Sequence, residues 1–239
     1  IVRFERQGGG KDAIQRAAKM LSDAKFPVIL SGAGVVIGDA INECKALAEK
    51  LDAPVCNGYQ HNDSFPGSHP LAVGPLGYNG SKAAMQLISK ADVVLALGTR
   101  LNPFSTLPGY GIDYWPKNAN IIQVDMNPDR IGLTKKVTVG IAGDAKQVAK
   151  QIFDKLSSNA GDSGRDERKN LIHQTKSAWL QTLTSLDHED DDPGTVWNKE
   201  ARERDKDRMS PRQAWRAIQA AMPEDCLLYT SDAADEKRW

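Results

Sequence analysis

The feature that most constrains this chain is an alternation of short aliphatic runs with segments whose apolar residues repeat at helical spacing. Each run is rich in Val, Ile and Leu and ends in small or polar residues, which is typical of strands buried on both faces of a parallel sheet. The first run starts at Pro27, and the others span residues 53–56, 92–97, 121–125 and 137–141. Strands of this kind joined by helices predict an α/β fold with a doubly wound, mostly parallel sheet.

Four amphipathic helices are expected to cover this sheet. Their apolar residues recur three and four positions apart, which gathers them on one face of each helix. These residues are Ile14, Ala17, Ala18 and Leu21; Ile41, Cys44, Leu47, Ala48 and Leu51; Ala84, Leu87 and Ile88; and Val148, Ile152 and Leu156. Ser81 and Asp144 precede two of the helices and are expected to be N-caps, because their side chains can accept hydrogen bonds from the free amides of a first turn.

A glycine-rich turn follows the first strand, at residues 31–34. Glycine there allows a tight strand-to-helix turn and lets an anionic ligand approach backbone amides. The alternative is that the glycines only pack a helix against the sheet. An NAD-type dinucleotide site is disfavoured, because Gly32, Gly34 and Gly38 are spaced one residue too widely for its fingerprint. The second strand also ends in Asn57, where such a site has an acid that holds the ribose.

The segment 57–80 is rich in Gly, Pro, Asn and aromatic residues and has little apolar periodicity. It is expected to be a long irregular loop, and loops of this length in a compact domain are usually functional. His61 and Asp63 are candidate catalytic residues, and His69 is a candidate partner for them. The alternative is that these histidines only form hydrogen bonds within the loop.

Arg100 follows the strand 92–97 and is expected to lie where ligands bind an open α/β sheet, beyond the carboxyl ends of its strands. There it can meet a phosphate or a carboxylate, or it can cap a neighbouring helix as a surface residue. A second irregular segment follows, with the aromatic residues Phe104, Tyr110, Tyr114 and Trp115. We expect these side chains to anchor the loop, although a stacked ligand or a subunit contact also fits them.

Composition narrows the possible partners and the compartment. The formal net charge of the 239 residues is zero, so no overall field steers the chain toward nucleic acid or an acidic membrane surface. No apolar run approaches the roughly 20 residues that a membrane-spanning helix needs. Cys44, Cys56 and Cys226 stand far apart without a metal-binding spacing, which favours buried free thiols in a reducing cytoplasm.

The last third of the chain changes character. Residues 158–208 are polar and charged, and are expected to form a linker with solvated faces. Apolar residues inside it imply some helix: Leu171, Ile172, Trp179, Leu180, Leu183 and Leu186. Residues 211–222 predict one more amphipathic helix, where a new domain begins. The chain starts at Ile1 instead of methionine, so we expect a longer parent protein.

Five ordered blocks carry a family resemblance. They are PVILSGAGV, HPLAVGPLGYNG, ADVVLALGTR, IIQVDMNPDRIG and GDA. In this order and spacing they resemble the central domain of thiamine-diphosphate enzymes of the acetolactate-synthase type. The resemblance implies a Rossmann-like central domain over 11–157, reached through a linker at 1–10 from a pyrimidine-binding domain. It also implies that 209–225 start a diphosphate-binding domain. Residues 226–239 depart from the family's pattern, so we expect a non-native tail there.

Two longer stretches, CNGYQHNDSFPGSHPLAVGPLGYNGSKAAM and GTRLNPFSTLPGYGIDYWP, resemble one group within this family. Its members convert sulfoacetaldehyde and phosphate to acetyl phosphate and sulfite, in sulfonate (taurine) metabolism. The resemblance implies thiamine diphosphate and Mg²⁺ as cofactors, both held by the flanking domains. It therefore also implies that this chain alone is inactive and holds no catalytic or metal-binding residue. The parent enzyme is expected to be a homodimer or homotetramer, in the cytoplasm that the free thiols favour.

Two alternatives stay open at this point. One is another lyase or decarboxylase of the same thiamine-diphosphate family. The other is a sirtuin-like NAD-dependent deacylase, because residues 32–34 and 60–63 resemble short elements of that enzyme. The four zinc cysteines of sirtuins have no counterpart in this chain, and a metal analysis for zinc would separate the two.

Some relatives bind FAD or ADP in their central domain through equivalent blocks. By position, the resemblance implies these cofactor-binding residues: Gly32, Gly34, Gly58, Tyr59, Leu76, Gly77, Tyr78, Gly98, Thr99, Arg100, Asp125, Met126 and Asp144. The flavin-binding pattern has an acid and a base where this chain has Asn102 and Phe104. The expectation is therefore a vestigial or empty nucleotide site that serves as a scaffold.

Overall fold

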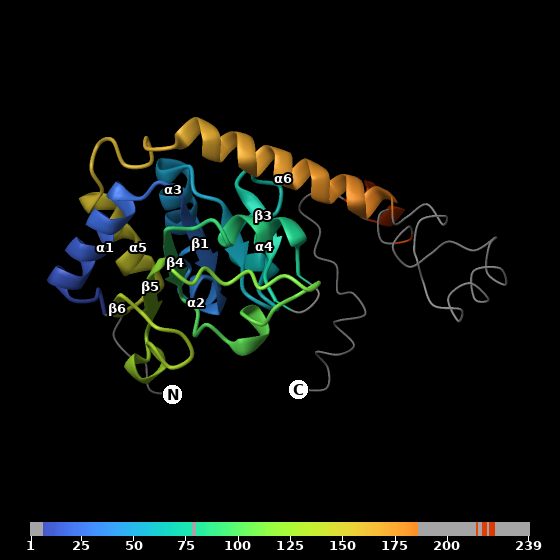
Figure 1. Cartoon of the computed structure of the whole chain (residues 1–239). Helices are drawn as coiled ribbons and strands as arrows, with labels where there is room; N and C mark the ends of the chain where they lie inside the picture. The colour runs from blue at the N-terminus through green and yellow to red at the C-terminus, as the bar shows by residue number, and fades with distance from the viewer. Residues whose placement is uncertain (1–6, 78–79, 186–213, 215–216, 219, 223–239) are drawn as a thin grey trace, which may run out of the picture. The chain divides into compact units, whose positions relative to one another are not determined.

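The computed structural model describes residues 7–77, 80–185, 214, 217, 218 and 220–222. The chain divides into two compact units, residues 1–179 and 180–239. The fold and the site described below belong to the first unit, and Figure 1 labels its helices and strands. The predicted tail at 226–239 lies outside the described residues.

The first unit is built on a six-stranded sheet in the order β3-β2-β1-β4-β5-β6, and all pairs are parallel. The strands are β1 (Pro27–Ser31), β2 (Val55–Asn57), β3 (Ala72–Pro75), β4 (Val93–Leu97), β5 (Asn120–Asp125) and β6 (Val139–Ala142). This is the strand order of a doubly wound Rossmann-type sheet, so the predicted fold class is confirmed. The order reverses between β1 and β4, which are hydrogen-bonded neighbours.

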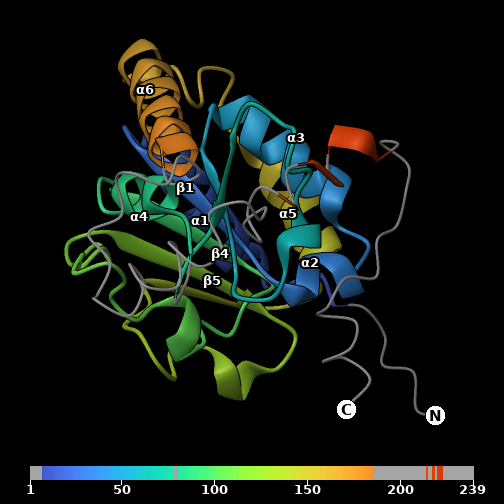
Figure 2. The same cartoon turned by 90° about the vertical axis from the view of Figure 1, so that its right-hand side faces the viewer.

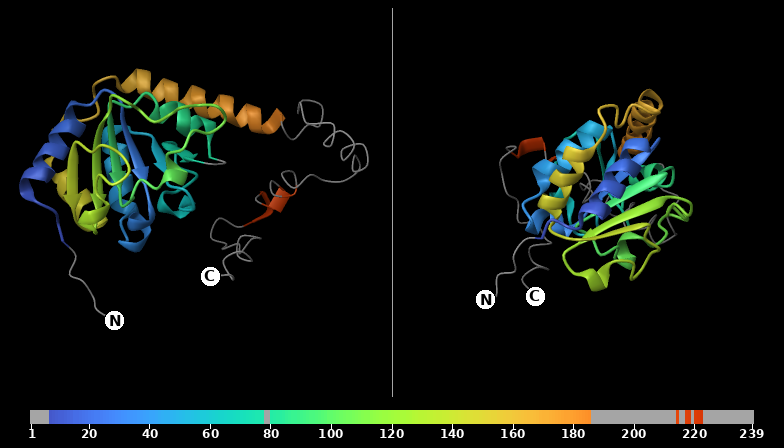
Figure 3. Two further views of the ribbon diagram at one scale, coloured as in Figure 1. Left: turned by 60° about the horizontal axis from the view of Figure 1, so that its bottom comes forward. Right: turned by 90° about the vertical axis from the view of Figure 1, so that its left-hand side faces the viewer.

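Helices cover both faces of the sheet. They are α1 (Lys11–Asp23), α2 (Ala33–Ile37), α3 (Ile41–Leu51), α4 (Lys82–Ile88), α5 (Ala145–Lys155) and α6 (Arg165–Ser185). The right-handed crossovers β1-α3-β2 and β3-α4-β4 run in opposite directions along the sheet, which puts α3 and α4 on opposite faces (Figure 2). Helix α5 packs against both α1 and α3 (Figure 3). None of the helices in the described part of the chain is both long and apolar enough to cross a membrane.

The predicted helix faces and caps are confirmed. Ile14, Ala17, Ala18 and Leu21 of α1 are all buried, and so are the predicted residues of α3 except Ile41, which is partly buried. The Ser81 hydroxyl accepts a hydrogen bond from the Ala84 amide at 3.2 Å. The Asp144 carboxylate accepts one from the Gln147 amide at 3.1 Å.

The expectation of an entirely irregular loop over 57–80 is wrong, because the edge strand β3 lies within it. Its four residues include Gly74 and Pro75, which give no strand signal in the sequence. The strand exists because its backbone pairs with β2, with Ala72 opposite Val55, and an edge position tolerates proline. A short 3₁₀ turn, Asn62–Ser64, precedes it.

Two predictions concern the last third. Helix α6 confirms helix within 158–208, and Ile172 is buried while Leu186 lies outside the described residues. Of the helix predicted at 211–222, the described residues 214, 217, 218, 220 and 221 are helical.

Candidate functional site

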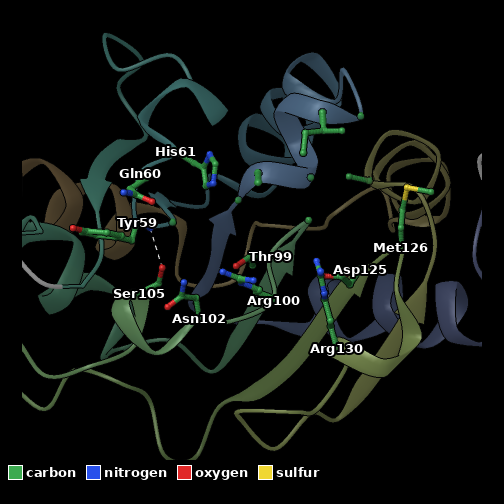
Figure 4. A pocket seen from close by; sticks show the side chains of 18 of the residues that line it. Tyr59, Gln60, His61, Thr99, Arg100, Asn102, Ser105, Asp125, Met126 and Arg130 are labelled. Atoms are coloured by element: carbon green, nitrogen blue, oxygen red, sulfur yellow. Dashed lines mark hydrogen bonds between the residues drawn. The ribbon is translucent and has the colours of Figure 1, made fainter. Parts of the chain in front are cut away.

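A pocket of about 560 Å³ lies at the carboxyl ends of β1, β4 and β5, where the strand order reverses (Figure 4). Most of the predicted cofactor-binding residues line it, namely Gly32, Gly34, Gly58, Tyr59, Gly98, Thr99, Arg100, Asp125, Met126 and Asp144. The structure adds residues that sequence reasoning did not assign to a cofactor: Ala33, Ile37, Gly38, Gln60, His61, Asn102, Ser105, Arg130, Gly143 and Ala145.

Three predicted residues are not among the pocket's lining. Leu76 is completely buried in the core. Gly77 lies directly under the Phe104 carbonyl, so that a Cβ atom on Gly77 would collide with it. Tyr78 lies outside the described residues. The backbone of residues 104–105 therefore covers Gly77.

The glycine-rich turn after β1 packs backbone to backbone against the turn after β4. The Gly34 amide donates to the Gly98 carbonyl at 2.8 Å. A Cβ atom on Gly34 would lie 2.7 Å from the Gly98 Cα, and one on Gly32 would lie 2.7 Å from the Gly98 carbonyl oxygen. Because real Cβ atoms do not approach so closely, these glycines are required by chain packing. The sequence left two roles open for these glycines, approach of an anionic ligand and packing of the chain. Direct contacts support the packing role.

A buried hydrogen-bond network positions the wall formed by residues 58–61. Ser31 and Ser64 each donate a hydroxyl hydrogen bond to the other's carbonyl, at 3.1 and 3.2 Å. The Asn57 amide group donates to the Ser64 hydroxyl at 3.0 Å and to the His61 carbonyl at 3.3 Å. These bonds fix the 3₁₀ turn against the ends of β1 and β2 and place His61 on the pocket.

The second wall comes from residues 102–105. The Ser105 hydroxyl accepts a hydrogen bond from the Tyr59 amide at 2.9 Å, drawn as a dashed line in Figure 4. The Tyr114 hydroxyl donates to the Ser105 carbonyl at 3.1 Å. The rings of Tyr59 and Phe104 stack with their centroids 5.8 Å apart. Tyr114 thus anchors the loop as expected, whereas Phe104 and Tyr110 remain 56% and 53% exposed.

The third wall follows β5 and is held by one buried amide. Gln123 Nε2 donates to the carbonyls of Thr99 and Arg130, both at 3.2 Å, and Gln123 Oε1 accepts from the Gly132 amide at 2.9 Å. These bonds place Arg130 on the pocket. The sequence signal for Arg130 was the same as for Arg100, since both follow a buried strand by a few residues.

Four acidic or guanidinium side chains line the pocket, and they lie at or after the ends of β4, β5 and β6: Arg100, Asp125, Arg130 and Asp144. Within the described part of the chain, the guanidinium groups of Arg100 and Arg130 have no hydrogen-bond or ion-pair partner. Asp125 accepts a hydrogen bond from the Asn127 amide at 2.8 Å. Two exposed apolar side chains, Ile37 at 80% and Met126 at 52%, also line the pocket.

The structure does not pair the candidate catalytic histidines. His61 Nδ1 lies 4.0 Å from Asp63 Oδ1. His69 instead lies 3.2 Å from Glu49 Oε1 through Nε2, and its Nδ1 accepts from the Leu71 amide at 3.2 Å. The expected pairing of His69 with the other two is therefore wrong. His69 is fixed in a structural role, because both of its ring nitrogens are already used.

The two described cysteines are buried and free, as predicted, and Cys226 lies outside the described residues. Burial raises the pKa of Cys44 to about 12 and that of Cys56 further still. Neither thiol is therefore a nucleophile at neutral pH. The described residues also contain no group of three or more His, Cys, Asp or Glu side chains placed to hold a metal ion.

Comparison with known proteins gives a family match. The model of the family described as thiamine pyrophosphate enzyme, central domain, matches residues 14–152. A solved structure of benzoylformate decarboxylase from Polynucleobacter necessarius superposes with a TM-score of 0.55 at 23% identity, covering 69% of this chain and 30% of the other. At that identity the likeness shows the fold alone.

Curated relatives are more similar in sequence. A probable sulfoacetaldehyde acetyltransferase from Rhizobium meliloti (strain 1021) is 76% identical over 96% of this chain and 39% of its own length. A sulfoacetaldehyde acetyltransferase from Roseovarius nubinhibens is 70% identical over 95% of this chain and 38% of its own. An acetolactate synthase large subunit from Buchnera aphidicola is 36% identical over 63% of this chain and 26% of its own. The chain thus spans about two fifths of the length of the first two relatives.

Proposed function

The chain belongs to the thiamine pyrophosphate enzyme family through its central domain, and on that basis we propose that the complete protein is a sulfoacetaldehyde acetyltransferase. In the proposed reaction, sulfoacetaldehyde and phosphate give acetyl phosphate and sulfite. The substrates are thus a small aldehyde and inorganic phosphate, and the reaction is a step of sulfonate metabolism.

The observation that carries this proposal is a contrast in identity. Relatives named as sulfoacetaldehyde acetyltransferases are 70% and 76% identical over nearly the whole chain, including most of the charged segment after the sheet. The acetolactate synthase subunit matches only 151 residues at 36% identity. A shared fold alone does not require such likeness in surface loops. The contrast also disfavours another lyase of the family, and the family match leaves no support for a sirtuin-like deacylase.

The proposed cofactors are thiamine diphosphate and Mg²⁺, held by parts of the complete protein outside this chain. Thiamine diphosphate supplies the carbanion chemistry of the reaction when it is bound. The groups that this chain contributes, among the residues described, lack a metal-binding cluster and an activated nucleophile. Their proposed role is support and ligand positioning, in a domain that lies between a linker at 1–10 and a further domain from 209, with helix α6 of the segment 158–208 packed on the domain.

The test is an assay of the complete protein. Acetyl phosphate should form from sulfoacetaldehyde and phosphate, only when thiamine diphosphate and Mg²⁺ are present. Pyruvate serves as the control substrate, because acetolactate formation from it would support the other branch of the family. Product from pyruvate and none from sulfoacetaldehyde would refute the proposed substrate. We further propose a cytoplasmic homodimer or homotetramer, which light scattering on the same preparation tests.

We also propose that the pocket binds a nucleotide of the size of ADP, and not FAD. The unpartnered guanidinium groups of Arg100 and Arg130 support an anionic ligand, since such groups form strong hydrogen bonds with phosphate. The Asp125 carboxylate could accept hydrogen bonds from ribose hydroxyls, and the apolar side chains of Ile37 and Met126 could contact a base. The covered position of Gly77 supports a ligand shorter than FAD.

Calorimetric titration of ADP, FAD and inorganic phosphate into the complete protein tests this second proposal. ADP should bind more tightly than FAD, and Arg100→Met or Arg130→Met should weaken ADP binding by about tenfold or more, the typical effect of losing a charge-assisted hydrogen bond. Lys90→Met changes an exposed cation far from the pocket and is the control. Tight FAD binding would contradict the proposal. Absence of nucleotide binding would support the empty scaffold site expected from the sequence.

A further inference from the structure

The most deeply buried charge in the described part of the chain is Arg168 of α6, which is 0% exposed. A guanidinium has five N–H donors, and here every one meets a backbone carbonyl. The bonds are Nε to Asp52 at 2.9 Å, Nη1 to Lys25 at 2.6 Å and Ser163 at 2.8 Å, and Nη2 to Leu51 at 2.8 Å and Gly161 at 2.6 Å. The side chain is fully satisfied without a direct carboxylate partner.

These carbonyls belong to three separate segments of the first unit. Leu51 and Asp52 end α3, where carbonyls lack partners within the helix and the helix dipole favours a cation. Lys25 lies between α1 and β1, and Gly161 belongs to the loop before α6. Gly161 has a φ of +85°, and a Cβ atom on it would lie 2.8 Å from the Leu51 Cα. One side chain therefore joins α6 to α3, to the start of the sheet and to its own preceding loop.

The charge of Arg168 is balanced nearby. The Asp52 carboxylate lies 2.7 Å from Arg165 Nε and 3.3 Å from Lys169 Nζ. Burial lowers the pKa of the Arg168 guanidinium, and the neighbouring Asp52 opposes that shift. Arg165 and Lys169 of α6 thus both pair with the Asp52 carboxylate at the end of α3, and Arg165 also pairs with Asp162 at 3.1 Å.

A second contact lies two turns further along α6. Lys176 Nζ donates to the Pro70 carbonyl at 2.7 Å and to the His69 carbonyl at 3.4 Å. The next residue, Leu71, donates its amide to His69 and accepts a hydrogen bond from the Val55 amide, directly before β3. In Figure 1, α6 runs from the end of α3 toward β3 and α4.

The face of α6 that carries Arg168 and Lys176 is also packed against the domain between these two residues and after Lys176. Ile172 and Thr175 lie against the domain. The ring of Trp179 lies 6.2 Å from that of Tyr110. Trp179 is the last residue of the first unit, so the packed face of α6 extends to the end of that unit.

We infer that residues 165–179 of α6, here called the clasp, are part of the folded central domain and that Arg168 is their main attachment to it. We also infer that Lys176, through its bonds to the His69 and Pro70 carbonyls, stabilises the residues directly before the edge strand β3. The clasp opens as one cooperative unit when Arg168 loses its five carbonyl partners. The polar composition of 158–208 predicts a linker, but this part of it is an element of the folded domain.

Hydrogen exchange followed by mass spectrometry on the complete protein tests the clasp. In Arg168→Met, amides of 168–179 should exchange at least about 100-fold faster, because charged hydrogen bonds at a buried site are lost, while β1 and β4 keep their protection. Arg168→Lys keeps the charge but has three donors, so it should give an intermediate increase. Gln174→Met changes an exposed side chain of the same helix and should change exchange by less than about threefold. Unchanged protection in both Arg168 variants would refute the fastening role.

Lys176→Met is the second variant, and it also covers the case in which Arg168→Met does not fold. It leaves the Arg168 contacts in place. Exchange should increase by about tenfold at 172–179 and at Ala72 and Val73, but not at 168–171, because only the second contact is lost. Wild-type exchange at Ala72 and Val73 would refute the link to β3. Equal acceleration over all of 168–179 would refute Arg168 as the main fastening.

Discussion

At the scale of single residues, the contact between Gly34 and Gly98 sets a limit on side-chain volume. A methyl group on Gly34 would meet backbone atoms of Gly98 at 2.7 and 3.0 Å, and backbone cannot move aside as a flexible side chain can. We predict that Gly34→Ala lowers the free energy of unfolding by about 3 kcal/mol, at the upper end of the cost of overpacking. Urea unfolding measures this change.

Gly67→Ala is the matched control, because a Cβ atom there has nothing within 4 Å. It should leave stability unchanged or raise it by up to about 1 kcal/mol through a stiffer unfolded chain. If Gly34→Ala were as stable as the control, the turn after β1 would be able to move away from β4. Its glycines would then need another explanation.

A second residue-scale prediction concerns Cys44 and pH. Its pKa rises from 9.0 to about 12 in the folded state, chiefly through burial, although a hydrogen bond with Ser31 opposes the rise. The folded state therefore keeps a proton that the unfolded state loses. The resulting stability is fully present below pH 9 and falls as pH rises from about 9 toward 12, by roughly 1 kcal/mol per pH unit.

Urea unfolding at pH 7, 8, 9 and 10, under reducing conditions, measures that slope. In Cys44→Ala the loss of stability above pH 9 should be smaller than in the wild type by this amount. The absolute stability of the variant at pH 7 is not the test, since the substitution also removes buried atoms. Equal slopes in the two proteins would show that the Cys44 thiol ionises normally in the folded state.

At the scale of elements, Gln123 on β5 ties together the segments that follow β4 and β5. Gln123→Met keeps a similar shape but leaves the carbonyls of Thr99 and Arg130 and the amide of Gly132 without their partner. We predict a loss of about 2 to 3 kcal/mol in the free energy of unfolding, the cost of buried polar groups left unsatisfied. Faster hydrogen exchange at residues 130–132 should accompany it.

Asn118→Met is the control for this prediction, since it changes an exposed amide just before the same strand. It should alter stability by less than about 0.5 kcal/mol. Loss of stability in Gln123→Met without faster exchange at residues 130–132 would mean that Gln123 supports the core and not the pocket wall.

The elements also show which parts of the fold the sequence predicts. Helices α1, α3 and α5 were predictable because their apolar stripes repeat at the helical period and report the buried face directly. Strand β3 was not, since its position depends on pairing with β2 and not on its own residues. The buried face of α6 could not be predicted from an apolar stripe, because its most buried side chain is that of Arg168.

The same distinction applies to the candidate site. Arg100 could be predicted, because ligands of open α/β sheets lie beyond the carboxyl ends of the strands, whereas Gly98 and Asp125 were expected from the family resemblance alone. Asn102 and Ser105 reach the pocket only through the folding of a loop whose path depends on long-range hydrogen bonds. The spacing from Arg100 identified Asn102 through the flavin-binding pattern, but it gave no signal for Ser105.

At the scale of the whole molecule, the described unit combines an α/β sheet, a pocket where the strand order reverses, and helix α6, which is bound to the domain through Arg168 and Lys176. These parts place binding groups and fix the geometry of the domain, but they supply no activated nucleophile and no metal-binding cluster among the described residues. We propose that the chemistry of the complete enzyme depends on groups from the rest of the protein.

The last prediction follows from that division. The 239-residue chain, expressed by itself, should fold around its sheet, with amides of β1 and β4 protected from hydrogen exchange, yet form no acetyl phosphate with thiamine diphosphate, Mg²⁺ and both substrates. The complete protein is the positive control in the same assay. Protected strands without product would agree with a scaffold role for this domain. Product from the chain alone would place catalytic groups within it, and His61, on the pocket, would then be the first residue to replace.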